Sequence, residues 1–237
     1  MRAKKNDTPP ARARPKDLDK AFDILEDLWG NEKNEPLLEH NEPLDGLVLT
    51  LLSQNTNDRN RDRGFAALKS VFPSWEAVAS APSESIAEAI RPAGLAKTKS
   101  ERLLQILETI KASFGEYSLE KLKIMEDDAI RKYLSSLPGI GAKTVACVML
   151  FDLGRAAFPV DTHIARFCRR MGWVEETLAP EEIQQVLEEW VPPSRYLGGH
   201  VNIIEHGRGL CRARNPECPG CPLAPYCFFA GHKNGAS

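Results

Sequence analysis

The amino-acid sequence predicts an all-α protein. Three observations support this fold class. Apolar residues recur at helical spacing along most of the chain, no segment sustains the apolar–polar alternation of a half-buried strand, and residues that favour helix N-termini precede many of the apolar runs. No internal repeat with a period of roughly 20–50 residues is present. We expect about ten short helices.

The first helix is expected to begin after Asp17 and to end at Gly30, which acts as a stop. Its apolar stripe consists of Leu18, Phe22, Leu25, Leu28 and Trp29.

Residues 1–16 precede this helix and differ in composition, with six basic side chains, one acidic side chain and three prolines. Because so few apolar groups cannot offset the chain entropy lost on folding, we expect residues 1–16 to form a disordered basic tail. Such a tail is either simply solvated or attracts DNA without sequence preference.

The remaining helices follow in two runs. The segment Leu44–Leu52 is apolar nearly all round, which is typical of a buried central helix. Ser74, Ser83 and Ser118 can cap helix N-termini, and Pro180 suits a first helical turn. The expected ranges are 57–71, 74–80, 84–91, 98–113, 118–122 and 127–136, and then 142–153, 162–172, 180–190 and 196–208.

Length and composition indicate one large or two small globular domains, since the chain has 237 residues, of which 42% are hydrophobic and 27% charged. The net charge of -2 does not by itself indicate nucleic acid. Residues 1–16 lack the apolar core of a secretory signal, and no apolar run is long enough to span a membrane. We therefore expect a cytoplasmic protein, in which the six cysteines are reduced and serve as metal ligands or buried thiols.

A Pro-Gly-x-Gly turn in the segment Leu137–Thr144 separates two helical stretches. Its two glycines, Gly139 and Gly141, allow positive φ angles and close approach of a ligand to the backbone, and the following helix N-terminus favours an anion. A nucleotide-binding P-loop is excluded, because Ala142 separates Gly141 from Lys143 and a helix rather than a strand precedes the turn. On its own, this segment is equally consistent with a plain tight turn between helices.

Four cysteines lie in one proline-rich segment with the spacing C-x6-C-x2-C-x5-C. Four thiolates this close together suit a tetrahedral metal or an iron–sulfur cluster. The single C-x2-C pair argues against zinc, which favours two such pairs, without excluding it. These candidate ligands are Cys211, Cys218, Cys221 and Cys227. The other two cysteines, Cys147 and Cys168, lie on apolar helix faces and are expected to be inert core residues.

The hairpin, together with the later element Pro159–Ile164, resembles the helix-hairpin-helix, Gly/Pro-rich loop, Asp superfamily of DNA glycosylases, and endonuclease III in particular. The resemblance spans roughly residues 20–228. It implies that Lys143 is the nucleophile, that Asp161 is the second catalytic group, and that the four cysteines hold a [4Fe-4S] cluster.

The same resemblance implies how the protein contacts DNA. The hairpin backbone at Gly139, Ile140 and Gly141 would bind a phosphate. A flipped-out nucleotide leaves a gap in the duplex, which residues from other loops would fill. The implied side chains are Gln54 or Asn55 as a plug, Leu95 as a wedge, and His163 in the base pocket.

The implied fold has a disordered basic tail (1–16), a six-helix barrel domain (37–153) and an iron–sulfur cluster domain (17–36 and 154–230). The implied activity is that of a monomeric, prokaryotic base-excision enzyme, which removes oxidised pyrimidines from double-stranded DNA and cleaves abasic sites by β-elimination. Two alternatives stay open, namely a glycosylase of other lesion or mismatch specificity and a non-catalytic DNA-binding iron–sulfur protein.

Overall fold

The computed structural model describes residues 13–30 and 42–234, and within these ranges it contains helices and turns but no strand, which confirms the all-α prediction. The expected tail lies mostly outside these residues, as does the expected domain boundary near residue 36. The α-helices are α1 (Leu18–Trp29), α2 (Pro43–Ser53), α3 (Asp58–Val71), α4 (Trp75–Ala79), α5 (Ser83–Ala89), α6 (Ala96–Phe114), α7 (Asp127–Ser136), α8 (Ala142–Cys147), α9 (Thr162–Met171), α10 (Pro180–Trp190), α11 (Tyr196–Gly209) and α12 (Phe228–Asn234). Short 3-10 turns are η1 (Arg91–Ala93), η2 (Glu120–Ile124), η4 (Pro193–Arg195), η5 (Cys218–Gly220) and η6 (Ala224–Tyr226), and η3 (Val148–Asp152) is a π-helical turn.

The helix starts test the capping predictions. Ser74 caps α4, because its Oγ accepts a hydrogen bond from the backbone N of Ala77 at 3.2 Å. The prediction for Ser83 is wrong: Pro82 occupies the cap position, and Ser83 is already the first helical residue. Pro180 is the first residue of α10, as predicted.

Two predicted α-helices differ from the structure. The segment at 118–122 forms the 3-10 turn η2 instead, and Ser118 Oγ accepts from the backbone N of Glu120 at 3.1 Å and donates to Glu42 Oε2 at 2.7 Å. The expected helix at 142–153 stops being α-helical after Cys147 and continues as the π turn η3. A side chain that bonds to the local backbone or to a distant carboxylate competes with regular helix geometry, and sequence periodicity does not detect it.

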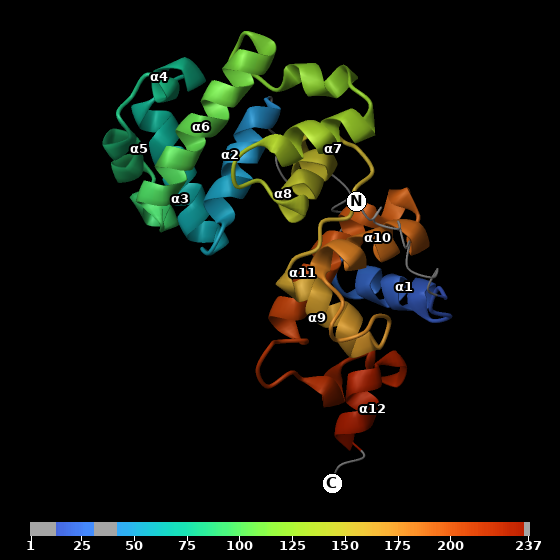
Figure 1. Cartoon of the computed structure of the whole chain (residues 1–237). Coiled ribbons are helices and arrows are strands. Elements are labelled where there is room, and N and C mark those ends of the chain that lie inside the picture. Colours follow the sequence, from blue (N-terminus) through green and yellow to red (C-terminus); the bar gives the residue numbers. More distant parts are fainter. Residues whose placement is uncertain (1–12, 31–41, 235–237) are drawn as a thin grey trace, which may run out of the picture.

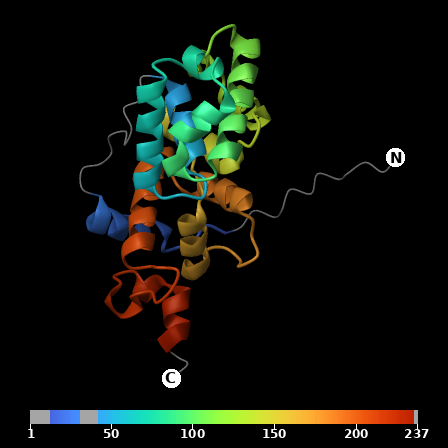
Figure 2. The same cartoon turned by 90° about the vertical axis from the view of Figure 1, so that its left-hand side faces the viewer.

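The helices form two lobes, which Figures 1 and 2 show one above the other. One lobe contains α2–α8 around a hydrophobic cluster that runs from Leu44 to Ala157. Helix α2 lies at its centre, since Leu47, Leu51 and Leu52 are fully buried.

The other lobe brings the N-terminal helix α1 together with α9–α12 around a second cluster that extends to Leu223. Helix α1 packs on α11, where Gly199 lets the Phe22 ring approach; an added Cβ would lie 2.4 Å from Phe22 Cε1. The predicted apolar stripe of α1 is only partly correct, because Leu28 is 37% exposed.

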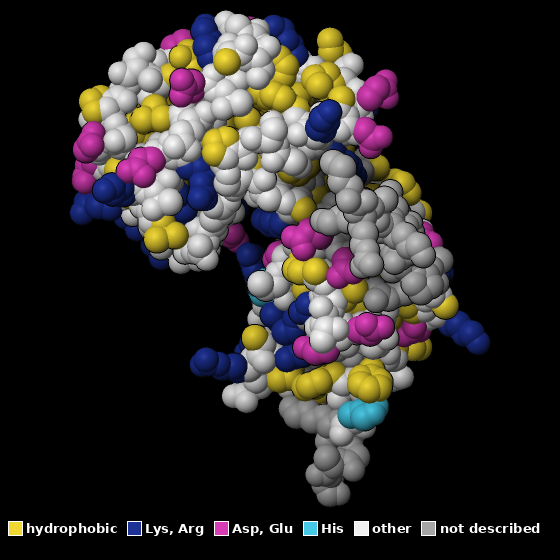
Figure 3. Space-filling view, in the orientation of Figure 1, with side chains coloured by type: hydrophobic (Ala, Val, Ile, Leu, Met, Phe, Trp, Pro, Cys, Tyr) yellow, Lys and Arg dark blue, Asp and Glu magenta, His cyan; other side chains and the backbone are white. Residues whose placement is uncertain are grey.

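The chain crosses between the lobes in the short segment after η3, because Ala157 belongs to the first cluster and Phe158 to the second. Helix α8 is therefore the last α-helix of the first lobe, and α9 is the next α-helix along the chain, in the second lobe. Figure 3 shows a hollow in the surface between the lobes, with Lys and Arg side chains around it. Among the described residues, no helix is both long and apolar enough to cross a bilayer.

Candidate active site between the two lobes

An open cavity of about 400 Å³ lies where the lobes meet. Helices α2, α3 and α8 contribute one wall, and α1, α11 and the start of α9 contribute the other. The lining residues are Trp29, Leu49, Thr50, Ser53, Asp58, Arg61, Lys143, Cys147, Phe151, Asp161, His200, Val201, Ile204, Glu205 and Arg208. The two predicted catalytic residues, Lys143 and Asp161, thus line the same cavity from different lobes.

Lys143 is half-buried in the first turn of α8, where the hairpin positions it. Cys147 lies one helical turn further on and also lines the cavity. Burial raises the pKa of the Cys147 thiol, and the neighbouring Lys143 ammonium opposes that rise. The expectation that Cys147 is only a core residue is therefore incomplete: the thiol is buried, but it lies beside the predicted nucleophile.

Asp161 is the N-cap of α9. Its Oδ1 accepts hydrogen bonds from the backbone N of His163 at 2.8 Å and of Ile164 at 2.9 Å. Both cap bonds use the same carboxylate oxygen, so Oδ2 takes no part in the cap. The cap fixes the orientation of the carboxylate, and a preorganised negative charge is what stabilises a developing positive charge without further rearrangement.

His200 of α11 is a cavity residue that sequence reasoning missed. It is 4% exposed, and its Nδ1 lies 2.9 Å from the carbonyl oxygen of Pro159. Burial lowers the pKa of His200 to about 4, although the negative charge of Asp161 opposes the shift. The imidazole is therefore neutral at physiological pH and contributes a polar but uncharged group to the cavity wall.

The hairpin takes the predicted place before α8, but its two glycines differ in conformation. Gly139 has φ 73°, in the left-handed region, whereas Gly141 has φ -96° and is extended. The turn thus uses the freedom of glycine to take a positive φ at Gly139 and does not use it at Gly141. The backbone at Gly141 is nevertheless open, since nothing lies within 4 Å of an added Cβ. The Ile140 side chain is buried in the hydrophobic cluster of the first lobe, and its backbone N donates to Leu137 O at 3.2 Å.

The predicted plug and wedge residues lie in two loops of the same lobe. Asn55 is exposed, with φ 54°, and Leu95 is 58% exposed, with φ 49°. Gln54 is half-buried and engaged within the protein, because its Nε2 donates to Gly139 O at 3.3 Å and its Oε1 accepts from Arg102 at 3.2 Å. Asn55 and Leu95 are therefore free to project toward a ligand, whereas Gln54 connects its loop to the hairpin.

His163 lies outside the set of residues that line the cavity. Its Nδ1 is 3.1 Å from Arg166 Nη2, and it packs against α11, where an added Cβ on Gly207 would come within 2.6 Å of that ring nitrogen. Burial lowers the pKa of His163. His163 therefore packs between α9 and α11, and its role in a base pocket stays a prediction.

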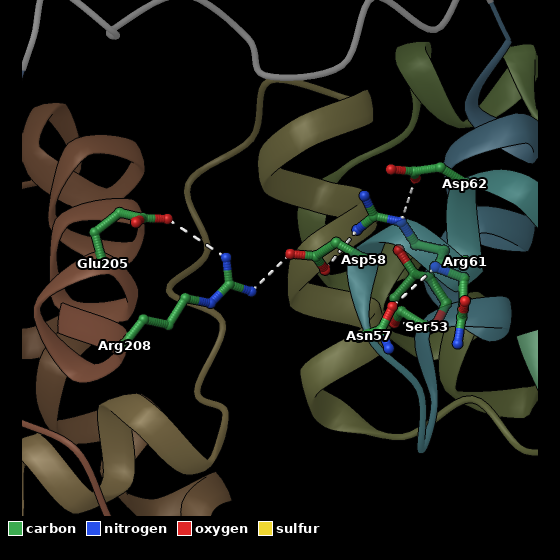
Figure 4. Close-up of polar contacts among 9 residues, drawn as sticks. Ser53, Asn57, Asp58, Arg61, Asp62, Glu205 and Arg208 are labelled. Carbon is green, nitrogen blue, oxygen red and sulfur yellow. Dashed lines mark hydrogen bonds and ion pairs between the residues drawn. The ribbon is translucent and has the colours of Figure 1, made fainter.

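An ion pair bridges the two lobes at the cavity wall, where Arg208 Nη2 of α11 lies 2.7 Å from Asp58 Oδ2 of α3. Each partner has a second oppositely charged neighbour (Figure 4). Arg208 Nη1 is 3.4 Å from Glu205, and Asp58 Oδ1 is 3.3 Å from Arg61. All these charges are partly exposed, so their contribution to stability is small. The arrangement places arginines and carboxylates together in the wall of this cavity.

The four clustered cysteines line a second, much smaller cavity of about 20 Å³. Arg170 of α9 is the nearest cation, with its Nη1 3.3 Å from Cys211 Sγ, and its carbonyl oxygen accepts from Cys227 Sγ at 3.2 Å. Burial raises the pKa of the Cys221 and Cys227 thiols, and nearby cysteines raise it further. Cys168, by contrast, is fully buried, with a pKa raised to about 12, as expected of an inert core thiol.

Comparison with known proteins gives consistent matches. The profile of the family described as HhH-GPD superfamily base excision DNA repair protein matches residues 48–193. An Arabidopsis thaliana protein provisionally named a DNA glycosylase is 38% identical over 212 residues, which are 84% of this chain and 72% of that protein. Endonuclease III of Thermotoga maritima is 32% identical over 190 residues, which are 79% of this chain and 84% of that enzyme.

Among solved structures, a trapped endonuclease III–DNA covalent intermediate superimposes with a TM-score of 0.79. It shares 24% sequence identity and covers 92% of this chain and 97% of its own. At that identity the likeness establishes the fold.

Proposed function

The chain belongs to the HhH-GPD superfamily of base excision DNA repair proteins, and we propose that it is a bifunctional DNA glycosylase and AP lyase that acts on oxidised pyrimidines in duplex DNA. The observation that carries the proposal is the joint placement of Lys143 and Asp161 in the wall of one cavity between the lobes. A lysine amine and a carboxylate are the two groups that this chemistry requires.

Lys143 is the proposed nucleophile. Its neutral amine attacks C1′ of the extruded nucleotide while the bond from C1′ to the base nitrogen breaks, and the base leaves with a proton. The amine-linked sugar then opens to a protonated imine. This cation acidifies C2′, so loss of a C2′ proton expels the 3′ phosphate by β-elimination. Water finally hydrolyses the imine and frees Lys143.

Asp161 has two proposed roles in this sequence. Positive charge builds on the sugar as the base departs, and a fixed carboxylate stabilises it. The same carboxylate accepts the proton that the Lys143 ammonium must lose before attack. The cap bonds at Oδ1 support this proposal, because they orient the side chain without using Oδ2.

The four cysteines are the proposed ligands of a [4Fe-4S] cluster. The proposal is supported by the chemistry of the donor set, since Cys211, Cys218, Cys221 and Cys227 line one largely apolar cavity and Arg170 offers a positive charge beside the first of them. Among the described residues, however, no three Cys, His, Asp or Glu side chains are already arranged to hold a metal ion. Such a cluster would supply cross-links between the α9 end of the lobe and a proline-rich segment that has little apolar core of its own. Its proposed role is structural, as it lies apart from the cavity that contains Lys143.

A different lesion specificity is the second candidate. The Arabidopsis thaliana DNA glycosylase/AP lyase ROS1 is 32% identical over 170 residues, which are 65% of this chain and 12% of that longer protein. A thermostable thymine-DNA glycosylase has the same fold, with a TM-score of 0.77 and 20% identity. Strand-cleavage assays on duplexes with thymine glycol, dihydrouracil, uracil, thymine mispaired with guanine or an abasic site distinguish these specificities.

The proposed chemistry is tested by covalent trapping. Borohydride reduces the imine to a stable amine, so the native protein and an abasic duplex should give a covalent adduct at Lys143. Lys143→Gln should lose both the adduct and strand cleavage while it retains DNA binding. Lys132→Gln, which removes an exposed lysine of α7, is the matched control and should behave like the native protein. An undiminished adduct in Lys143→Gln would show that another residue is the nucleophile.

A further inference from the structure

Lys99 is a charged residue inside the barrel core, 2% exposed and located in the first turn of α6. Its Nζ donates a hydrogen bond to Leu52 O at 2.8 Å and another to Ala93 O at 2.9 Å. Burial lowers the pKa of Lys99, because desolvation disfavours its charged form. A methionine or leucine side chain would fill this space without the desolvation cost of a buried ammonium. The feature that distinguishes Lys99 from such a residue is its pair of hydrogen bonds to the two carbonyl groups.

The two acceptors lie at the ends of two other helical elements. Leu52 is in the last turn of α2, and Ala93 is the last residue of η1. Carbonyl groups at helix C-termini lack partners within the helix, and a cation is favoured there. A lysine in the first turn of its own helix, in contrast, is unfavourable for the helix dipole. The Lys99 ammonium therefore stabilises the C-terminal ends of α2 and η1 and not its own helix α6.

Each acceptor immediately precedes one of the loops predicted to contact DNA. Leu52 leads through Ser53 to Gln54 and Asn55, and Ala93 leads to Gly94 and Leu95. Both loop tips have left-handed backbones, with φ 54° at Asn55 and φ 49° at Leu95. Asparagine adopts this conformation readily, whereas leucine keeps it only where the surrounding structure imposes it. One ammonium thus anchors the bases of two loops, of which the Leu95 loop is strained.

Arg102, one turn further along α6, extends this link to the hairpin. Its Nη1 donates to Gln54 Oε1 at 3.2 Å, and Gln54 Nε2 in turn donates to Gly139 O at 3.3 Å. The Arg102 side chain also lies against Gly139, where an added Cβ would be 2.2 Å from Arg102 Nε. One face of α6 therefore connects all three loops that are predicted to meet DNA.

We propose that Lys99 is a positioning residue for nucleotide extrusion, which holds the Asn55 loop and the Leu95 loop at a fixed separation so that both tips enter the duplex together. This inference rests on the proposed glycosylase function and assigns Lys99 no contact with the substrate. It predicts that loss of Lys99 impairs the step that unstacks a paired nucleotide and spares the chemistry on a nucleotide that is already unpaired.

The test is Lys99→Met, which keeps the length and apolar stem of the side chain and removes both hydrogen bonds. Leu107→Ala is the control for a general loss of core stability, since Leu107 is fully buried two turns further along the same helix. Three rates are compared under single turnover: strand cleavage at thymine glycol in a duplex, at the same lesion in a single-stranded bulge, and at an abasic site. Fluorescence of 2-aminopurine next to the lesion reports extrusion directly.

Lys99→Met should lose about tenfold in the rate on the paired lesion and keep the bulge and abasic rates within about twofold, since unstacking is costly for a paired base and least so for a damaged or unpaired one. Its 2-aminopurine signal should rise more slowly. Leu107→Ala should show a lower melting temperature with equal changes in all three rates. If Lys99→Met does not fold, Lys99→Gln replaces it, because glutamine is too short to reach both carbonyls.

Equal losses on all three substrates by Lys99→Met would overturn this inference and leave Lys99 a purely structural residue. A native protein that neither cleaves nor is trapped on abasic DNA would overturn the proposed function, and this inference with it. The native protein's abasic-site activity therefore separates the two failures.

Discussion

The buried carboxyl group of Asp152 leads to a prediction of how the stability of the protein depends on pH. Its carboxylate lies over Gly46 of α2, where an added Cβ would come within 2.1 Å of all three carboxyl atoms. The buried Oδ1 has no hydrogen-bond partner. The Asp45 carboxylate acts electrostatically on Asp152, and its own Oδ1 accepts from Trp75 Nε1 at 2.9 Å and from Lys69 Nζ at 3.2 Å. Burial, with a further contribution from Asp45, raises the pKa of Asp152 from 3.8 to about 7.

This shift sets the direction of the pH dependence. A carboxyl whose pKa is raised by folding binds its proton more tightly in the folded state, so it stabilises the fold at low pH. That stability is lost as the pH rises from about 4 to about 7, while the folded state keeps a proton that the unfolded chain has released. At 1.36 kcal/mol per pKa unit, the shift from 3.8 to about 7 limits this loss in the free energy of unfolding to at most about 4 kcal/mol. A loss of half that maximum, about 2 kcal/mol, lowers the melting temperature of a chain of this size by roughly 4–8 °C.

Asp152→Asn has nearly the same shape and cannot ionise, so it should remove this loss. The melting temperature of Asp152→Asn minus that of the native protein should be small at pH 5, increase up to about pH 7.5, and then level off. Asp128→Asn, an exposed residue of α7, is the control and should give a flat difference. A difference for Asp152→Asn that is constant from pH 5 to pH 8 would show that its carboxyl titrates normally and would refute the reasoning.

Two further predictions concern the cysteines and the wedge loop. The purified protein should be yellow-brown, with about four irons per chain. Cys218→Ser should lose the iron and much of the solubility, whereas Cys168→Ala should keep the iron, and a colourless protein with one zinc would contradict the proposed cluster. Leu95→Ala should slow thymine-glycol excision about tenfold, or about 1.4 kcal/mol, and abasic-site cleavage less, with an unchanged melting temperature because Leu95 is 58% exposed. Equal losses on both substrates with a lower melting temperature would instead identify Leu95 as a core residue.

Features that depend on local sequence could be predicted. The all-α class and most helix boundaries follow from periodicity, and the Asp161 cap follows from a polar residue directly before a helix. Errors arose where tertiary contacts override local preference. Ser118 donates a hydrogen bond to Glu42, which is distant in the sequence. Asp152 lies over Gly46 and is the last residue of the π turn η3, where periodicity predicted an α-helix. Such contacts leave no periodic signal.

The same distinction explains why the sequence predicts the reaction better than the lesion. Lys143 and Asp161 are close in sequence and lie on either side of the point where the chain passes from one lobe to the other, so one short segment brings both to the junction. The rest of the cavity wall comes from distant segments, such as Trp29 of α1 and His200 and Arg208 of α11, whose neighbours are set only by the packing of the lobes. Chemistry at the sugar needs only the local pair, whereas discrimination among bases depends on the shape and polar groups of the whole wall. Relatives that share the hairpin and the aspartate element can therefore share the reaction and differ in the base that they remove.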